Sequence, residues 1–462
     1  MSFEAGNDKS IDLKLHHNSE LVMIDSWNFT GFIENTFYTS PFANVLLKQP
    51  GGQKTVVIDK TATHVFRVKA PIVGENQTIC IAGAAKILGA WNAKKALMLT
   101  KVIGEDYYEI SIDTAKSKFP FVYKYGIADA TTNTFLKFEE GEDRVLLEPV
   151  GKNKLVIIND GFVHLNTTHW KGAGVAIPVF SLRSNKSAGV GEFADIKLLV
   201  DWANKVGLKL IQILPINDTT ATHTWMDSYP YAAISAFALH PMFIRLNLVA
   251  NKEQQALLKP YADTIAELNA MAEIDYDGVM SLKWEVLRLL YSKNGKTDLA
   301  TKAFSEFFEN NKDWLVSYSA FSYLRDLHGT VDFNQWPTHA NYNEAAILKL
   351  VDPKSKTYQD IAFFYFVQFH LHLQLLEATQ YAHQNGVIVK GDIPIGVYRF
   401  GADAWQNKGL FHMDMQAGAP PDDFAVSGQN WGFPTYHWEA MVRDGFAWWI
   451  SRFDQMKFYF DA

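Results

Sequence analysis

The sequence predicts a multidomain chain in which an all-β sandwich is followed by an α/β domain of the barrel type. Between residues 56 and 163, short apolar runs alternate with turn residues, which is the spacing of an antiparallel sandwich. From about residue 172, apolar strand-like runs alternate with helical patterns, which is typical of parallel strands. At 462 residues the chain exceeds what one small core organises, so two or more domains are expected.

Three apolar segments carry the prediction of parallel strands. They cover residues 174–182, 208–218 and 387–389, and a helical apolar pattern lies between the first two. A strand, a helix and a strand in this order indicate a right-handed crossover. The last apolar run, 457–462, is expected to be a fourth, partial strand.

The composition narrows the functional class. Apolar residues make up 48% of the chain and aromatic residues 14%, which supports large cores and suits the stacking of sugars. A net charge of −7 without a basic stripe argues against a nucleic-acid partner. Cys80 is the only cysteine, so no internal disulfide forms. With no signal-peptide pattern in the first residues and no long apolar run, a cytoplasmic protein without a membrane partner is expected.

Asp392 is the first candidate functional residue. It follows the buried strand 387–389, at the end where the loops of a barrel build the active site. Taken alone, Asp392 fits the role of a turn cap equally well.

The loop that follows contains a second set of candidates: Asp422, Phe424, Gln429 and Trp431, which stand among glycines and prolines. An aromatic ring beside carboxylates and an amide is what a sugar site needs, because the ring covers apolar C–H faces while the polar groups bind hydroxyls. Taken alone, each of these residues more often has a structural role, either in core packing or in a turn. Together they predict a carbohydrate site.

The segments that carry these residues resemble a known family. KGDIPIGV, GAPPDDF, GQNWGFPTYHW and YFDA are similar to motifs of the 4-alpha-glucanotransferases of glycoside hydrolase family 77, in particular the disproportionating enzyme 2 (amylomaltase) type with starch-binding modules. The resemblance implies a TIM-type barrel over residues 164–462 that is incomplete in its C-terminal half. It also implies a helical insertion at about 251–384, where apolar positions recur at helical spacing.

Residues 56–163 resemble a family 20 starch-binding module through LGAW, FPFVYKY and FKFEEGEDR. By position, Trp91, Lys124 and Phe138 match its main sugar-binding platform. Two further residues match supporting positions, Glu139 and Arg144. Phe138 stands where that family usually has tryptophan, and the smaller ring is expected to weaken binding by about 1 kcal/mol. The alternative is that Trp91 is simply an exposed residue of the sandwich.

The family resemblance implies a retaining transfer of alpha-1,4-glucan or glucosyl units from maltose or maltodextrin to glycogen-like acceptors. A carboxylate nucleophile and a carboxylic acid about 5 Å apart suffice, so neither a cofactor nor a metal is expected. Tyr229, Tyr231 and Ser235 match a glucan-binding stretch and become candidates for contacts near the donor sugar. Asp392 matches a supporting carboxylate that orders the donor site.

The chain is expected to be truncated at both ends. Residues 1–55 resemble only the second half of a further starch-binding module, and are interpreted as its remnant. The resemblance places the nucleophile in an Arg-x-Asp-His motif directly after YFDA, beyond Ala462. Asp461 matches no catalytic position, so no catalytic residue is assigned and the chain is expected to be inactive alone.

Two alternative functions stay open. An alpha-glucan hydrolase would share the fold and the sugar site, and would differ in using water as the acceptor. A non-catalytic starch- or glycogen-binding protein would need only the binding residues. In every case the expected partners are alpha-1,4-glucans such as maltose, maltodextrin, starch or glycogen.

Overall fold

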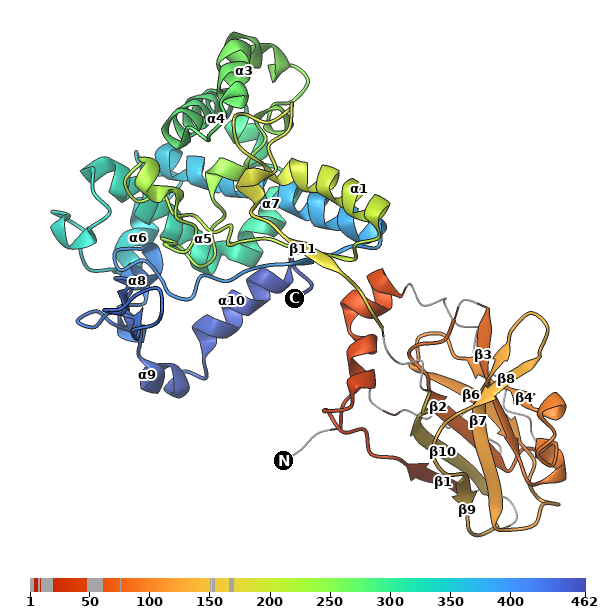
Figure 1. The fold of residues 1–462 in the computed structure, drawn as a ribbon. Helices are drawn as coiled ribbons and strands as arrows, with labels where there is room; N and C mark the ends of the chain where they lie inside the picture. The colour runs from red at the N-terminus through yellow and green to blue at the C-terminus, as the bar shows by residue number, and fades with distance from the viewer. Residues whose placement is uncertain are drawn as a thin grey trace. The chain divides into compact units, whose positions relative to one another are not determined.

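The chain forms two compact units in the computed structural model, residues 1–171 and residues 172–462 (Figure 1). The structure describes residues 4–6, 9, 20–47, 61–74, 76–149, 151, 154–165 and 170–462. Within these ranges, every helix is too short or too polar to cross a membrane. Each unit has a hydrophobic core of its own.

The first unit contains two five-stranded β-sheets. In spatial order the first sheet is β1 (Glu20–Asp25), β10 (Lys154–Phe162), β2 (His64–Lys69), β6 (Tyr107–Ile112) and β5 (Thr100–Lys101). The second is β4 (Leu97–Met98), β3 (Gln77–Gly83), β7 (Phe121–Asp129) and β8 (Phe135–Phe138), with β9 (Arg144–Leu146) also paired to β7. Buried side chains of both sheets share one core, among them Phe66, Ile112, Ile81 and Tyr123. The predicted sheet-rich domain is therefore confirmed, but it is not antiparallel throughout, because β10 pairs in parallel with both β1 and β2.

Strand β1 joins this unit from the N-terminal part of the chain. It pairs in parallel with β10 over its whole length, from Glu20 opposite Lys154 to Asp25 opposite Asn159. The predicted boundary near residue 55 lies outside the described residues. The origin of residues 1–55 as a remnant of a second module stays a prediction.

The second unit begins with a parallel sheet of three strands, in the order β11 (Gly174–Ala176), β12 (Leu210–Gln212) and β13 (Ile388–Lys390). Helix α1 (Ile196–Val206) connects β11 to β12 and ends at Gly207, whose φ of 79° lies in the left-handed region that glycine adopts without strain. The predicted strand–helix–strand order at this point is confirmed. A closed barrel needs eight strands, so the barrel form stays a prediction.

α-Helices make up most of the regular secondary structure of the second unit (Figure 1). Between β12 and β13 they are α2 (Leu246–Val249), α3 (Ala262–Ala270), α4 (Tyr276–Asp298), α5 (Lys302–His328), α6 (Glu344–Leu350) and α7 (Tyr358–Gln384). After β13 come α8 (Ala402–Gln406), α9 (Trp438–Arg443) and α10 (Ala447–Lys457). Helix α7 packs against α1, α4, α5 and β13, so it lies at the centre of the unit. It also leads directly into the strand that precedes Asp392.

The fourth strand expected at 457–462 is not formed. Lys457 is the last residue of α10, and the remaining five residues belong to no strand. The segment nevertheless lies beside β13, because the Asp461 amide donates to the Val389 carbonyl at 3.0 Å and the Gly391 amide donates to the Ala462 carbonyl at 2.9 Å. Tyr459 and Phe460 are buried. The apolar residues of this segment therefore lie in the core, although the segment forms no strand.

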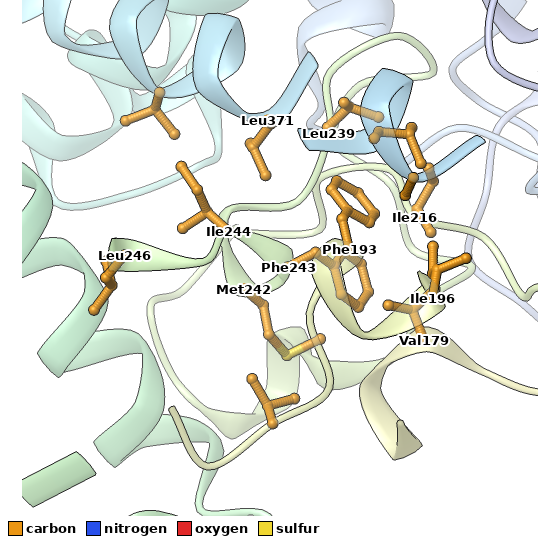
Figure 2. Packing of buried hydrophobic residues seen from close by; sticks show 14 of the residues in the cluster. Val179, Phe193, Ile196, Ile216, Leu239, Met242, Phe243, Ile244, Leu246 and Leu371 are labelled. Carbon is orange, nitrogen blue, oxygen red and sulfur yellow. The ribbon is translucent and has the colours of Figure 1, made fainter. Parts of the chain in front are cut away.

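The main core of this unit lies between α7 and the segments that precede α1 and follow β12. Figure 2 shows Phe193 and Phe243 close together, with Ile196 and Met242 beside them. The two phenyl rings are stacked with centroids 5.3 Å apart. The core includes side chains of β12, β13, α1, α4 and α7, so burial joins segments that are far apart in the sequence.

A buried ionic network lies beside this core. Lys283 on α4 is completely buried, and its ammonium group donates to Glu192 at 2.7 Å and to the carbonyls of Met242 and Ile244 at 2.6 and 2.8 Å. Arg245 binds Glu192 as well, and also Asp195 at 2.6 Å. These bonds tie α4 to the loop that starts α1. The pairing offsets part of the cost of removing the charges from water.

Candidate functional site

Two of the expected site residues meet directly. The Tyr231 hydroxyl donates to Asp392 Oδ2 at 2.9 Å, and both side chains are partly buried. Asp392 stands two residues after β13, and Tyr231 belongs to the long connection after β12. Partial burial and the neighbouring Asp392 carboxylate raise the pKa of Tyr231, so the phenol stays a hydrogen-bond donor. This contact joins the loops that follow two adjacent parallel strands.

The ring of Tyr229 lies next to this pair. Its centroid is 5.7 Å from that of Tyr231, and the residue is 55% exposed. An accessible ring beside a carboxylate is the combination that binds a sugar, since the ring covers C–H groups and the carboxylate accepts from hydroxyls.

Ser235 has a different environment from the two tyrosines. It is buried, and its hydroxyl oxygen accepts from the amides of Phe237 and Ala238 at 3.2 and 3.1 Å. These are bonds of a local turn. Ser235 therefore shapes this segment, and its contact with sugar stays a prediction.

Asp403 holds the same segment from the other side. This buried carboxylate accepts from the Ala236 amide at 2.7 Å and from the indole of Trp448 at 3.2 Å, and its burial raises its pKa. Trp405, on the same short helix α8, donates to the His339 carbonyl at 2.8 Å. Both side chains are buried and bind the backbone of other segments, Asp403 at Ala236 and Trp405 at His339. Their role in this structure is therefore to position these segments.

A β-hairpin carries the other expected site residues. Its two short ladders are β14 (Phe411–His412) with β17 (Thr435–Tyr436), and β15 (Gly418–Ala419) with β16 (Gln429–Asn430). Phe424 is 98% exposed in the loop between β15 and β16. Asp422 stabilises that loop, since its Oδ1 accepts from the amides of Phe424 and Ala425 at 2.9 and 2.7 Å.

The remaining two hairpin candidates contact each other. The Trp431 indole donates to Gln429 Oε1 at 2.9 Å. The chain can fold so tightly here because residue 418 is glycine, where a Cβ atom would collide with the Gln429 carbonyl. The hairpin thus presents one free aromatic ring at its loop and an amide–indole pair on its arm.

Arg399 is a functional candidate that the sequence patterns did not single out. Its guanidinium donates to the carbonyls of Met413, Met415 and Gly432, the last two at 2.5 and 3.1 Å. Both arms of the hairpin are therefore tied to one side chain of the segment after β13. Long-range bonds to backbone carbonyls leave no periodic signal in a sequence, so no local pattern could have found this role.

The first unit contains the expected starch-binding residues. The rings of Trp91 and Phe138 meet edge to face, with centroids 6.0 Å apart, and Trp91 is 39% exposed. Lys124 on β7 donates to the Gly141 carbonyl at 2.6 Å. The carboxylate of Glu139 is buried and accepts from Arg144 Nη2 at 2.9 Å. The structure thus brings the two rings together, as the resemblance implies for its sugar-binding platform.

Comparison with known families assigns both units. Residues 177–462 match the family model of glycoside hydrolase family 77, described as 4-alpha-glucanotransferase. This chain belongs to glycoside hydrolase family 77. Residues 62–156 match the starch binding domain of the CBM 20 type, and this family 77 chain therefore contains a starch-binding domain in front of its glucanotransferase region.

Relatives of this family 77 chain include plant and bacterial enzymes. It is 37% identical to the 4-alpha-glucanotransferase DPE2 of Oryza sativa subsp. japonica, over 96% of this chain and 48% of that protein. It is 34% identical to the 4-alpha-glucanotransferase of Chlamydia pneumoniae, over 60% of this chain and 52% of that protein. The chain thus spans about half the length of the curated relatives it matches.

Solved structures agree with the family assignment. The amylomaltase from Streptococcus agalactiae, solved in complex with acarbose, superposes with a TM-score of 0.54 at 26% identity, covering 63% of this chain and 58% of that one. The amylomaltase from Corynebacterium glutamicum gives a TM-score of 0.51 at 17% identity, covering 86% of this chain and 52% of that one. The second likeness shows a shared fold alone.

Proposed function

We propose that this chain forms the donor side of a site that transfers alpha-1,4-glucan units from maltose or maltodextrin to glycogen-like acceptors. The contact between Tyr231 and Asp392 is the observation that carries the proposal. It lies where loops follow adjacent parallel strands, which is where α/β proteins bind their ligands. The exposed rings of Tyr229 and Phe424 would cover the apolar faces of glucose residues.

The proposed reaction is a double displacement with retention. Asp392 is proposed to support the donor sugar rather than attack it, as the family resemblance implies, and the Tyr231 hydroxyl orients its carboxylate. The nucleophile is proposed to be another carboxylate, in the position after Asp461–Ala462 that the family resemblance implies. A carboxylic acid about 5 Å from that nucleophile would protonate the leaving oxygen and then activate the acceptor hydroxyl.

The first unit is proposed to hold the polymer. Trp91 and Phe138 provide the stacking surface, and Lys124 lies on the neighbouring strand β7. This binding needs no reaction, so it would persist in a chain that transfers nothing. It would raise the local concentration of glucan at the transfer site by tethering.

Two measurements on the 462-residue chain test the proposal. Glucose release from maltose with glycogen as acceptor should be absent, while calorimetry should detect binding of maltoheptaose. In a Trp91→Ala background, which removes the platform of the first unit, Asp392→Ala should abolish the remaining binding. Lys390→Ala is the matched control, since Lys390 is an exposed residue at the end of the same strand.

The outcomes separate the candidate functions. Unchanged maltoheptaose binding in the Asp392→Ala variant would overturn the proposed donor site. Glucose release dependent on glycogen would overturn the placement of the nucleophile and make Asp392 the first residue to test. New reducing ends without transfer products would favour a hydrolase.

A further inference from the structure

Two histidines and a glutamate lie together at the base of the hairpin. His412 is the last residue of β14, and His437 directly follows β17. In this antiparallel ladder His412 is opposite Thr435, so His437 is its diagonal neighbour on the same face. The two imidazole centroids are 4.5 Å apart. Glu439 in the first turn of α9 completes a group whose candidate ligand atoms all lie within 4.8 Å of one another.

The hydrogen bond of His437 fixes which of its nitrogens is available. Nδ1 lies 3.1 Å from the Gly409 carbonyl oxygen, which can only accept, so Nδ1 carries the proton. In the neutral ring, Nε2 then has a free lone pair. A histidine that donates one N–H to a backbone carbonyl and offers the other nitrogen is the usual arrangement of a metal ligand.

His437 Nε2, which has the lone pair, faces the carboxylate of Glu439. An ionised carboxylate can accept a hydrogen bond but cannot donate one. His437 Nε2 is 3.9 Å from Glu439 Oε2, too far for a hydrogen bond. A lone pair and a carboxylate at this distance do not attract each other unless a cation lies between them. A proton on Nε2 or a metal ion would each supply the missing positive charge.

We propose that His412, His437 and Glu439 form a binding site for a divalent transition-metal ion of the Zn²⁺ class. Two imidazoles and one carboxylate suit Zn²⁺ and are a poor set for Ca²⁺ or Mg²⁺, which prefer oxygen ligands. Around Zn²⁺ the ligand atoms lie about 2.0–2.2 Å from the metal. The three side chains therefore have to move closer together, and Glu439, whose side chain is 76% exposed, has the freedom to do so. A water molecule would fill the fourth position.

The site has a structural consequence for the hairpin. The β14–β17 ladder closes the segment from Met413 to Pro434, which includes Phe424 at its exposed loop. A metal ion shared by His412 and His437 would link the two ends of this segment across the ladder. It would stabilise the closed base of the hairpin in addition to the bonds of Arg399, because a ligand that binds only the folded form shifts the equilibrium towards it.

Zinc titration of the chelator-treated chain tests this site. Competition with a chromophoric chelator should show one Zn²⁺ bound per chain, and Co²⁺ in its place should give the intense visible absorption of a tetrahedral site. His437→Asn, His412→Asn and Glu439→Gln should each weaken binding by about 10-fold or more. Thermal unfolding without metal checks that each variant folds, and added Zn²⁺ should raise the midpoint of the parent chain but not that of His437→Asn.

His339→Asn is the matched control, since it removes an imidazole elsewhere in the same unit. Its φ of 66° is one that asparagine tolerates, so the substitution causes little strain. This variant should bind Zn²⁺ as the parent chain does. Equal Zn²⁺ binding by the parent chain and the double variant His412→Asn/His437→Asn would overturn the proposal, and so would equally tight binding of Mg²⁺ by the parent chain.

Discussion

The Tyr231 hydroxyl donates a 2.9 Å hydrogen bond to the Asp392 carboxylate, although the two residues are 161 positions apart in the sequence. The contact joins the connection after β12 to the loop after β13. It also orients the carboxylate, because a charged acceptor with a phenol donor makes one of the stronger hydrogen bonds in proteins. The donor side of the proposed glucan site depends on this pair.

Removal of the Tyr231 hydroxyl should weaken glucan binding to the second unit. In the Trp91→Ala background, Tyr231→Phe is expected to cost about 1.5–3 kcal/mol of maltoheptaose binding energy, since the carboxylate loses its orienting donor. Calorimetric titration measures this directly. Tyr229→Phe keeps the neighbouring ring and serves as the control, and it should change the affinity much less. Equal losses in both variants would contradict a specific role for the Tyr231–Asp392 bond.

Arg399 should determine how rigid the hairpin is. Its guanidinium binds three carbonyls, on both arms, and an ammonium group cannot reproduce that fork. Arg399→Lys should therefore increase hydrogen exchange between residues 413 and 434, as measured by mass spectrometry. Arg443→Lys, at an exposed position of α9, should leave the exchange of this segment unchanged. Unaltered hydrogen exchange in Arg399→Lys would show that the β14–β17 ladder keeps the hairpin rigid without the guanidinium group.

Loss of the buried ammonium group of Lys283 should destabilise the second unit strongly. Lys283→Met removes the ammonium donor of Glu192 Oε1 and of two carbonyls, although Arg245 still binds Glu192, and breaking a buried ion pair typically costs about 3–5 kcal/mol. Urea denaturation gives the change in the free energy of unfolding. Lys302→Met is the control, because the side chain of Lys302 is 91% exposed and its substitution should change stability by less than about 0.5 kcal/mol. A loss below about 1 kcal/mol for Lys283→Met would mean that Arg245 compensates.

His64 should make the first unit sensitive to acid. Burial lowers the pKa of His64 to about 4, although the charge of Asp113 partly opposes the shift. The pKa is lower in the folded state than the value of about 6.5 in an unfolded chain. The resulting stabilisation is complete above pH 6.5 and is lost as the pH falls towards 4, by up to about 3 kcal/mol.

The variant His64→Gln checks this assignment, because its side chain does not titrate. Between pH 7 and pH 4.5 the parent chain should lose more unfolding free energy than His64→Gln, as measured by urea denaturation at each pH. His164→Gln retains the titration of His64 and should follow the parent chain. Parallel pH profiles for the parent and His64→Gln would exclude His64 as the cause.

Only part of the candidate site could be predicted from its motifs. Asp392, Phe424 and the two tyrosines stand in recognisable segments, and the structure places Tyr229, Tyr231 and Asp392 together. Ser235 is also expected to contact sugar, and that role stays a prediction, because the structure shows only that its hydroxyl oxygen accepts from two amides of its own turn. A sequence motif identifies a residue type at a position. It does not specify whether a small hydroxyl faces a cavity or the backbone.

The apolar patterns by themselves determined the sheet-rich first unit and the strand–helix–strand order around α1, because alternation and helical spacing reflect local burial. The same patterns predicted a strand at 457–462 wrongly, since buried aromatic residues occur equally at the end of a helix. Only the tertiary structure decided the roles of Arg399 and Lys283, and the meeting of His412 with His437. Each depends on bonds or contacts between residues distant in sequence, whose geometry exists only once the chain has folded.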